Sequence, residues 1–138
     1  MQVSPYLSFK GQCEEAFNFY EQCLDGQLGA LFRYAGSPMA NQAPAGWDDK
    51  IMHGSVTIGD LVLMGADIAP AQYEEPKGFS LSIQIKDVTE AVRIYERLAE
   101  RGKVVMPLEK TFWAERFGMV VDRFVIPWLI NCEGADHA

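Results

Sequence analysis

The chain begins with a segment in which apolar and polar residues alternate and continues with one of helical period. Residues 3–9 place every second side chain on an apolar face, the pattern of a strand with one side buried. Residues 12–25 carry apolar residues at helical spacing, and Gly26 follows as a helix stop signal. Three further strands are predicted, over residues 27–34, 51–58 and 61–66, with a tight turn at Gly59-Asp60 and a long loop over 36–50.

The second half of the chain repeats this order of elements. The stretch EAFNFYE, from Glu15 to Glu21, returns as EAVRIYE from Glu90 to Glu96. The same sequence of patterns follows, over residues 79–85, 88–101, 103–111, 117–122 and 124–131, with Gly102 as the second helix stop. The repeat therefore predicts two tandem βαβββ modules, residues 1–68 and 78–138, joined by a polar, proline-containing linker at 69–77.

This order of elements predicts an α+β fold. Each short sheet is expected to bury one face against its own helix, which leaves the other face to be explained. If the two sheets close toward each other, they form a cup-shaped mixed β-sheet with the helices on its outer face. We expect the two modules to make one domain over residues 1–138.

The face of each sheet that points away from the helix carries small polar groups. In the opening strands these are Ser4, Tyr6 and Ser8, and then Ser80, Ser82 and Gln84. By the same alternation His53, Ser55 and Thr57 share that face, whereas Met52, Gly54 and Val56 point the other way. A cavity lined by dispersed hydroxyl groups and apolar patches suits a small organic ligand.

Composition narrows the class of partner. The net charge is −7 with a pI near 4.7, which argues against nucleic acid, because nucleic-acid binding draws on clustered Lys and Arg. There is no positively charged leader before an apolar stretch and no run of about 18 apolar residues, so no membrane segment is expected and the cytoplasm is the default location. The three cysteines match no metal-binding spacing and fit reduced thiols.

Several motifs carry a resemblance to a known family. They are Ser4-Pro5-Tyr6-Leu7-Ser8-Phe9, Glu15-Ala16, Phe19-Tyr20, Ile51-Met52-His53, Leu63-Met64, Thr111-Phe112-Trp113-Ala114, Phe117-Gly118 and Pro127-Trp128-Leu129-Ile130-Asn131. With paired βαβββ modules, they resemble the vicinal oxygen chelate superfamily of glyoxalases, extradiol dioxygenases and antibiotic-binding resistance proteins, and within it the PhnB-like branch. The resemblance implies one glyoxalase-like domain and a homodimer, in which some relatives exchange modules between chains.

Two departures from that family matter. Its metal-dependent members hold a divalent cation with four inward-facing His or Glu residues, and the resemblance lays those positions on Ser4, Met64, Ser80 and Leu129. None of these side chains is a competent ligand for zinc, nickel or iron, so we expect neither a metal nor another cofactor. The branch also has Gly in a turn where this chain has Val125, so that turn must differ in shape or be strained.

The candidates for chemistry are few. His53 is the best single candidate for ligand contact, and it or a carboxylate such as Glu109 could act as acid or base; a packed or solvated histidine is the plainer interpretation. Trp113, with Phe112 and Phe117, could form an aromatic wall or fill a core. The expected ligand-binding residues are Tyr6, His53, Ser80, Gln84, Trp113 and Asn131.

Three hypotheses about function remain open. The first is a metal-free protein that binds a small hydrophobic or amphipathic molecule. The second is an isomerase or lyase that uses the same cup with His53 or a carboxylate, and the third is an interaction protein with a vestigial cavity. The chain has no Gly-x-Ser-x-Gly elbow, phosphate loop or dinucleotide fingerprint, and it lacks the glycine-rich turn of a methyltransferase that uses S-adenosylmethionine, a label sometimes given to relatives.

Overall fold

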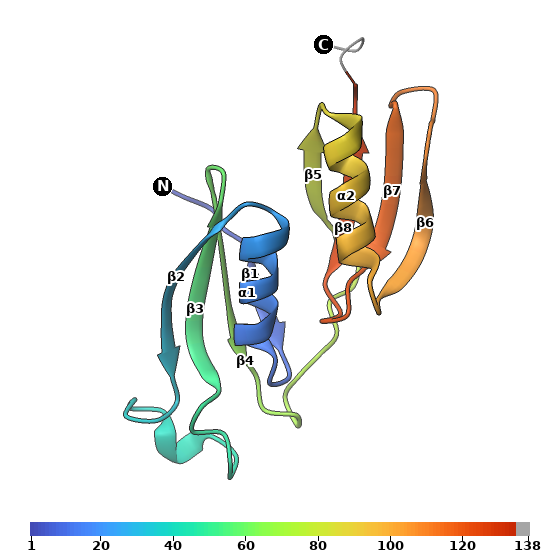
Figure 1. Cartoon of the computed structure of the whole chain (residues 1–138). Coiled ribbons are helices and arrows are strands. Elements are labelled where there is room, and N and C mark those ends of the chain that lie inside the picture. Colours follow the sequence, from blue (N-terminus) through green and yellow to red (C-terminus); the bar gives the residue numbers. More distant parts are fainter. Residues whose placement is uncertain (135–138) are drawn as a thin grey trace. The chain divides into compact units, whose positions relative to one another are not determined.

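A computed structural model describes residues 1–134 and divides the chain into two compact units, Met1–Glu75 and a second that begins at Pro76 (Figure 1). The elements of the first unit are β1 (Tyr6–Phe9), α1 (Cys13–Cys23), β2 (Gln27–Arg33), a short 3-10 helix η1 (Ala40–Gln42), β3 (Ile51–Ile58) and β4 (Leu61–Asp67). Those of the second are β5 (Leu81–Ile85), α2 (Val88–Ala99), β6 (Lys103–Glu109), β7 (Arg116–Val121) and β8 (Pro127–Cys132).

Both units have the same topology. The strand order is β1-β4-β3-β2 in the first unit and β5-β8-β7-β6 in the second. The opening strand pairs in parallel with the last strand of its unit, and the remaining pairs are antiparallel. Each four-stranded mixed sheet carries its helix on one face (Figure 1). The predicted α+β class and the two tandem βαβββ modules are therefore confirmed.

The face of the first sheet that packs on α1 forms the core of that unit. Leu7 and Phe9 alternate inward along β1, and Phe17 of α1 meets Phe9 edge to face with ring centroids 5.6 Å apart. Tyr20 is fully buried beside them. This arrangement follows from the period of two in the strand and the helical spacing in α1.

The second unit buries the equivalent surfaces. Ile94 and Leu98 of α2 are buried, as are Val120 and Ile130 of the strands beneath the helix. The hydroxyl of Tyr95 donates a hydrogen bond to the backbone oxygen of Met106 at 3.0 Å, which ties α2 to β6. The two helix tyrosines, Tyr20 and Tyr95, are therefore part of the packing of their own units.

Two buried aspartates fix the loops around each sheet. The carboxylate of Asp67 accepts hydrogen bonds from the backbone N–H groups of Gly11, Cys13 and Ile51 at 2.8–3.0 Å. Asp122 in the second unit accepts from two backbone N–H groups of the following turn and from the indole N–H of Trp128. Because each buried carboxylate is fully supplied with donors, these residues stabilise the fold and are not free for chemistry.

The opening strands are shorter than the sequence pattern predicts. β1 begins at Tyr6 instead of Val3, because Pro5 has no backbone N–H to donate to the neighbouring strand. β5 begins at Leu81 instead of Phe79, after Gly78 has turned the chain with φ of +79°. Both predicted polar positions at the strand starts, Ser4 and Ser80, therefore lie outside the strands.

The helix ends also differ from the prediction. α1 ends at Cys23 and α2 at Ala99, and the left-handed residues after them are Asp25 (φ +53°) and Arg101 (φ +56°), not the glycines that follow. A Cβ atom added to Gly26 would lie 2.9 Å from the backbone oxygen of Thr57. Close approach of helix end and strand thus requires glycine there, and the same holds for Gly102 against Val121.

Candidate functional site

The face of the first sheet that points away from α1 brings Tyr6 and His53 together. The hydroxyl of Tyr6 in β1 and Nδ1 of His53 in β3 are 3.0 Å apart, and the rings lie near parallel with centroids separated by 5.7 Å. The hydrogen bond crosses β4, which lies between these strands. Period-two alternation correctly predicts that the two residues share a face, and their part in binding stays a prediction.

Phe32 extends this cluster on the other side of the histidine. It is the partner of His53 in the β2–β3 register, and the two rings are stacked with centroids 6.3 Å apart. The side chain is 54% exposed. Sequence reasoning missed Phe32, because β2 contains a register shift between Leu28 and Leu31 that obscures its alternation. We call Tyr6, His53 and Phe32 the imidazole cluster.

The imidazole cluster offers a hydrogen-bond donor to a ligand. Burial raises the pKa of Tyr6, and the nearby Cys13 and Tyr34 raise it further, so the phenol stays protonated at neutral pH and can donate to Nδ1 of His53. A neutral imidazole that accepts at Nδ1 carries its proton on Nε2. Within residues 1–134 the structure gives Nε2 no partner, so this N–H is available to an acceptor.

The second unit presents amide groups on its corresponding face. Nδ2 of Asn131 donates to Oε1 of Gln84 at 2.8 Å, and Nε2 of Gln84 donates to the hydroxyl of Ser82 at 2.7 Å. Oδ1 of Asn131 is buried without a hydrogen-bond partner among the described residues. This chain of amides fixes the orientation of Gln84 and leaves one acceptor on Asn131 unfilled.

Strand register places four predicted residues in one region of the second unit. Gln84 pairs with Asn131, Asn131 with Phe117, and Phe117 with Glu109, which makes a row across β5, β8, β7 and β6. Cross-strand partners lie on the same side of a sheet. Trp113 contacts Phe117 with ring centroids 5.2 Å apart, and Phe112 packs edge to face on Trp113. The sequence predicts these residues as candidates but not their common row.

The predicted residue Ser80 and two further polar side chains, Arg33 and Cys13, are placed less favourably. Ser80 precedes β5 and makes no hydrogen bond within the described part of the chain. The guanidinium group of Arg33 is bound by Glu14 at 2.8 and 3.1 Å and by the backbone oxygen of Asp49, so it is not free to orient a substrate. Cys13 is fully buried, and burial together with Asp67 and Glu14 raises its thiol pKa, so it is not an activated nucleophile.

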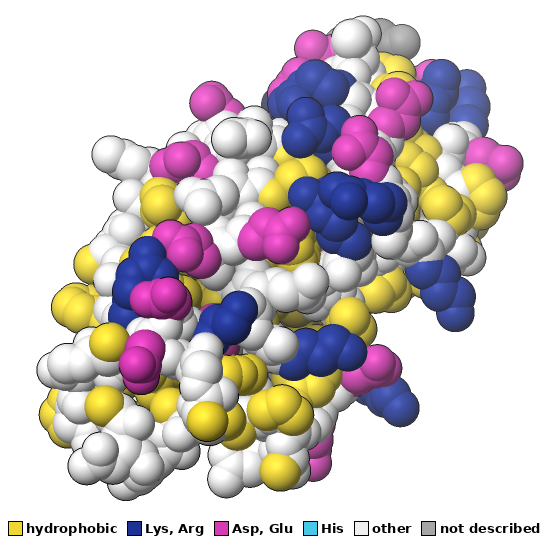
Figure 2. All heavy atoms as spheres, turned by 60° about the horizontal axis from the view of Figure 1, so that its bottom comes forward, with side chains coloured by type: hydrophobic (Ala, Val, Ile, Leu, Met, Phe, Trp, Pro, Cys, Tyr) yellow, Lys and Arg dark blue, Asp and Glu magenta, His cyan; other side chains and the backbone are white. Residues whose placement is uncertain are grey.

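Charge and metal donors are dispersed over the molecule. Acidic and basic side chains lie among one another on the face shown in Figure 2. Residues 1–134 contain no group of three or more His, Cys, Asp or Glu placed to hold a metal ion, and no helix among them is long and apolar enough to cross a membrane. Two of the positions that the family resemblance assigns to metal ligands, Met64 and Leu129, lie on β4 and β8 with thioether and aliphatic side chains.

Comparison with known proteins agrees with the paired modules. The model of the Glyoxalase/Bleomycin resistance protein/Dioxygenase superfamily matches residues 2–130. The chain belongs to this superfamily. The match confirms the family resemblance that the sequence motifs carry, and it makes this a fold that binds small ligands.

Individual relatives cover nearly the whole chain. Protein YjdN of Escherichia coli (strain K12) is 35% identical over 139 residues, which cover 95% of each sequence. The crystal structure of protein PA1353 from Pseudomonas aeruginosa is 47% identical with a TM-score of 0.87, over 97% of this chain and 98% of that one. A PhnB protein from Bacillus cereus, described as a putative 3-demethylubiquinone-9 3-methyltransferase, is 22% identical with a TM-score of 0.83, over 96% and 99% of the two chains, and shows the same fold.

Proposed function

We propose that this protein is a metal-free binding protein for a small organic molecule. The observation that carries the proposal is the hydrogen bond between Tyr6 and Nδ1 of His53 on the sheet face away from α1. It fixes an imidazole with an unused N–H on the surface of a sheet, where a ligand can reach it. Membership of a superfamily whose fold binds small ligands supports this proposal.

Absence of a metal is part of the proposal. The positions at which metal-dependent relatives carry His or Glu are Ser4, Met64, Ser80 and Leu129 here, and none supplies a strong donor for zinc, nickel or iron. Among residues 1–134, neither His53 nor Glu109 belongs to a group of three or more His, Cys, Asp or Glu placed to hold a metal ion. Elemental analysis of the purified protein would contradict the proposal if it found about one transition metal per chain.

We further propose that the two modules form one domain and that the protein is a cytoplasmic homodimer. The support is the four-stranded half-sheet of each unit, whose edge strands β2 and β6 keep backbone groups unpaired. β6 also exposes three apolar side chains, Val104, Val105 and Met106, which a second subunit would bury. Light scattering tests the dimer, and a monomer at micromolar concentration would exclude it.

An enzyme that uses His53 as a base is the second candidate. The observation that favours it is again the contact with Tyr6: in the tautomer in which Nδ1 donates to the Tyr6 hydroxyl, Nε2 keeps a free lone pair and can accept a proton. The methyltransferase description of the Bacillus cereus neighbour is not carried over. At 22% identity that neighbour shares the fold alone, and this chain lacks a glycine-rich turn for S-adenosylmethionine.

Native mass spectrometry of protein purified from cells tests the binding proposal. We expect a small organic molecule to stay bound to the wild-type protein and to be lost from the double variant Tyr6→Phe/His53→Gln. Arg97→Ala, on α2 of the second unit, is the matched control and should retain it. A co-purified molecule that the double variant holds as tightly as the wild type would place the site elsewhere, and a protein that binds none from a metabolite library would exclude the function.

A further inference from the structure

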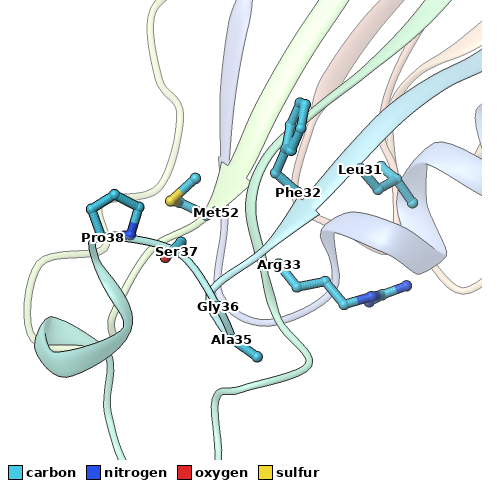
Figure 3. A pocket seen from close by; sticks show the side chains of 8 residues that line it. All are labelled: Leu31, Phe32, Arg33, Ala35, Gly36, Ser37, Pro38 and Met52. Atoms are coloured by element: carbon cyan, nitrogen blue, oxygen red, sulfur yellow. The ribbon is translucent and has the colours of Figure 1, made fainter.

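The first unit contains an open pocket of about 350 Å³ beside the imidazole cluster. Its lining comes from the end of β2, the following loop and the start of β3, namely Leu31, Phe32, Arg33, Ala35, Gly36, Ser37, Pro38 and Met52 (Figure 3). The volume is in the range of pockets that hold small organic molecules. All of its residues belong to one unit, so the pocket depends on that unit alone.

A β-bulge puts Met52 into this pocket. In the β2–β3 register Phe32 pairs with His53 and Arg33 with Ile51, which leaves Met52 as an extra residue without a partner. The sequence alternation, which places Met52 on the face opposite His53, is therefore wrong at this position, because a bulge interrupts the period of two. Figure 3 shows Met52 and Phe32 on the same side of the strands, with Arg33 pointing away.

The polar groups around the pocket already have partners. The guanidinium group of Arg33 is held by Glu14 and by the backbone oxygen of Asp49. The hydroxyl of Ser37 donates to the backbone oxygen of Tyr34 at 2.7 Å and accepts from the backbone N–H of Met39 at 3.1 Å. What the pocket offers a ligand is therefore the apolar surface of Phe32, Pro38 and Met52.

Phe32 connects this apolar surface to a hydrogen-bond donor. Its ring lines the pocket and also stacks on His53, whose Nδ1 is bound to Tyr6. His53 does not line the pocket itself, so a ligand that fills the pocket reaches Nε2 of the imidazole by extending past the ring of Phe32. The acceptor on the ligand should be uncharged, because the protein carries a net charge of −7 and repels anions.

We propose that this pocket and His53 together bind a carbonyl compound, with its aromatic or aliphatic group against Phe32 and Met52 and its carbonyl oxygen on Nε2 of His53. The inference rests on the proposed binding function and gives it a ligand class. The apolar group supplies burial, and the single hydrogen bond supplies orientation. A hydrocarbon without the oxygen, or a ketone without the apolar group, should each bind more weakly.

Titration of the isotope-labelled full-length protein with three probes, followed by amide NMR, tests the ligand class. Benzylacetone combines a phenyl ring and a ketone, propylbenzene lacks the ketone, and acetone lacks the ring. We expect saturable shifts from benzylacetone at Phe32, Gly36, Met52 and His53, and binding of the other two probes to be weaker by about tenfold or more. Equal binding of benzylacetone and propylbenzene would overturn the role of His53.

Variants test the lining. Met52→Gln keeps the size of the side chain but makes it polar, and should weaken benzylacetone about tenfold. His53→Gln should remove the preference for benzylacetone over propylbenzene. Val105→Gln, an exposed apolar position of β6 in the other unit, is the control and should change neither. Thermal unfolding of each variant checks that the fold is intact.

Failure of this inference is distinguishable from failure of the binding function. Benzylacetone shifts confined to Gln84, Phe117 and Asn131 would overturn the pocket and leave the binding function standing. Unchanged affinity in a folded Met52→Gln variant would do the same. If no probe binds while a cellular molecule is retained in the mass spectrometer, the carbonyl assignment is wrong, and if no small molecule is retained either, both proposals are wrong.

Discussion

His53 and Phe117 hold equivalent positions in the two units. Each lies on the third strand of its βαβββ module and directly precedes a buried glycine. A Cβ atom added to Gly54 or Gly118 would lie 2.7 or 2.8 Å from the side chain of Leu31 or Tyr95. Each pairs with the strand that follows the helix, His53 with Phe32 in one unit and Phe117 with Glu109 in the other.

The duplicated fold therefore carries different chemistry at the same place. The first unit presents an imidazole between two rings, whereas the second presents a phenyl ring between a carboxylate and an amide. Close packing explains why the glycine recurs, because a side chain there would meet the neighbouring strand or helix. The residue before each glycine, His53 or Phe117, is only partly buried, so it is under no such restriction and can differ between the units. We therefore expect the two units to contact a ligand through different chemical groups.

Removing the Tyr6 hydroxyl should change the tautomer of His53. In the wild type the phenol occupies Nδ1, which favours the form with its proton on Nε2. In Tyr6→Phe we expect a mixture of tautomers and a loss of about 0.5–1.5 kcal/mol in unfolding free energy. Imidazole nitrogen shifts measure the first and urea unfolding the second. Phe32→Leu, which leaves the hydrogen bond in place, should keep the wild-type tautomer. An unchanged tautomer in Tyr6→Phe would show that Tyr6 does not set it, and a wild-type proton on Nδ1 would show that Nδ1 is the donor.

Loss of the Asp67 carboxylate should destabilise the first unit strongly. Three backbone N–H groups depend on it, and in Asp67→Ala they lose their acceptor in a buried site. The expected cost is roughly 2–4 kcal/mol in unfolding free energy, measured by urea unfolding. Glu74→Ala, at an exposed position near the end of the first unit, is the control and should stay within about 0.5 kcal/mol of the wild type. Similar losses in both variants would contradict the structural role of the carboxylate.

Where the strands are regular, the alternation along them was enough to predict which residues share a face. Tyr6 and His53 are far apart in sequence, but the alternation along their strands predicts that both side chains lie on the same face of the sheet. The structure joins them by a hydrogen bond. The row that joins Gln84 to Glu109 was not predictable, because it depends on the register between strands, which a single sequence does not reveal. The bulge at Met52 was missed for the same reason, since it exists only relative to β2.

Stability should fall as the pH rises above about 9, in part through Cys13. Burial, followed by the charges of Asp67 and Glu14, raises the pKa of this thiol above its ordinary value of 9.0. Above that value the unfolded chain loses the thiol proton while the folded protein keeps it, so the unfolded state is favoured with increasing pH. The stabilisation that the Cys13 thiol contributes to the free energy of unfolding is fully present below pH 9.0. It declines by at most about 1.4 kcal/mol per pH unit above that pH.

Cys13→Ala isolates this contribution between pH 9 and 10, below the ordinary tyrosine pKa of 10.0. The variant loses some packing at all pH values, but its unfolding free energy should decline less steeply with pH than that of the wild type. Tyr6, Tyr34 and Tyr95, whose pKa values are also raised by burial, act at higher pH. Parallel pH profiles for the two proteins from urea unfolding would rule out Cys13 as a source of the decline.

Replacing Val125 by glycine should stabilise the protein. Val125 has φ of +73° in the turn between β7 and β8, and its backbone N–H donates to the oxygen of Asp122 at 3.0 Å. In this left-handed conformation a β-branched residue is strained by about 1–2 kcal/mol, whereas glycine adopts it without strain. Glycine also raises the entropy of the unfolded chain, which offsets part of the gain. The sequence comparison with a branch that has glycine at this turn predicts strain, and the positive φ agrees. We therefore expect Val125→Gly to raise the unfolding free energy by about 0.5–1 kcal/mol in urea unfolding.

Val105→Gly is the control, because Val105 lies at an exposed position of β6 and has no positive φ. This variant should lower the unfolding free energy. A loss of stability in both variants would show that Val125 contributes more by packing than it costs in strain.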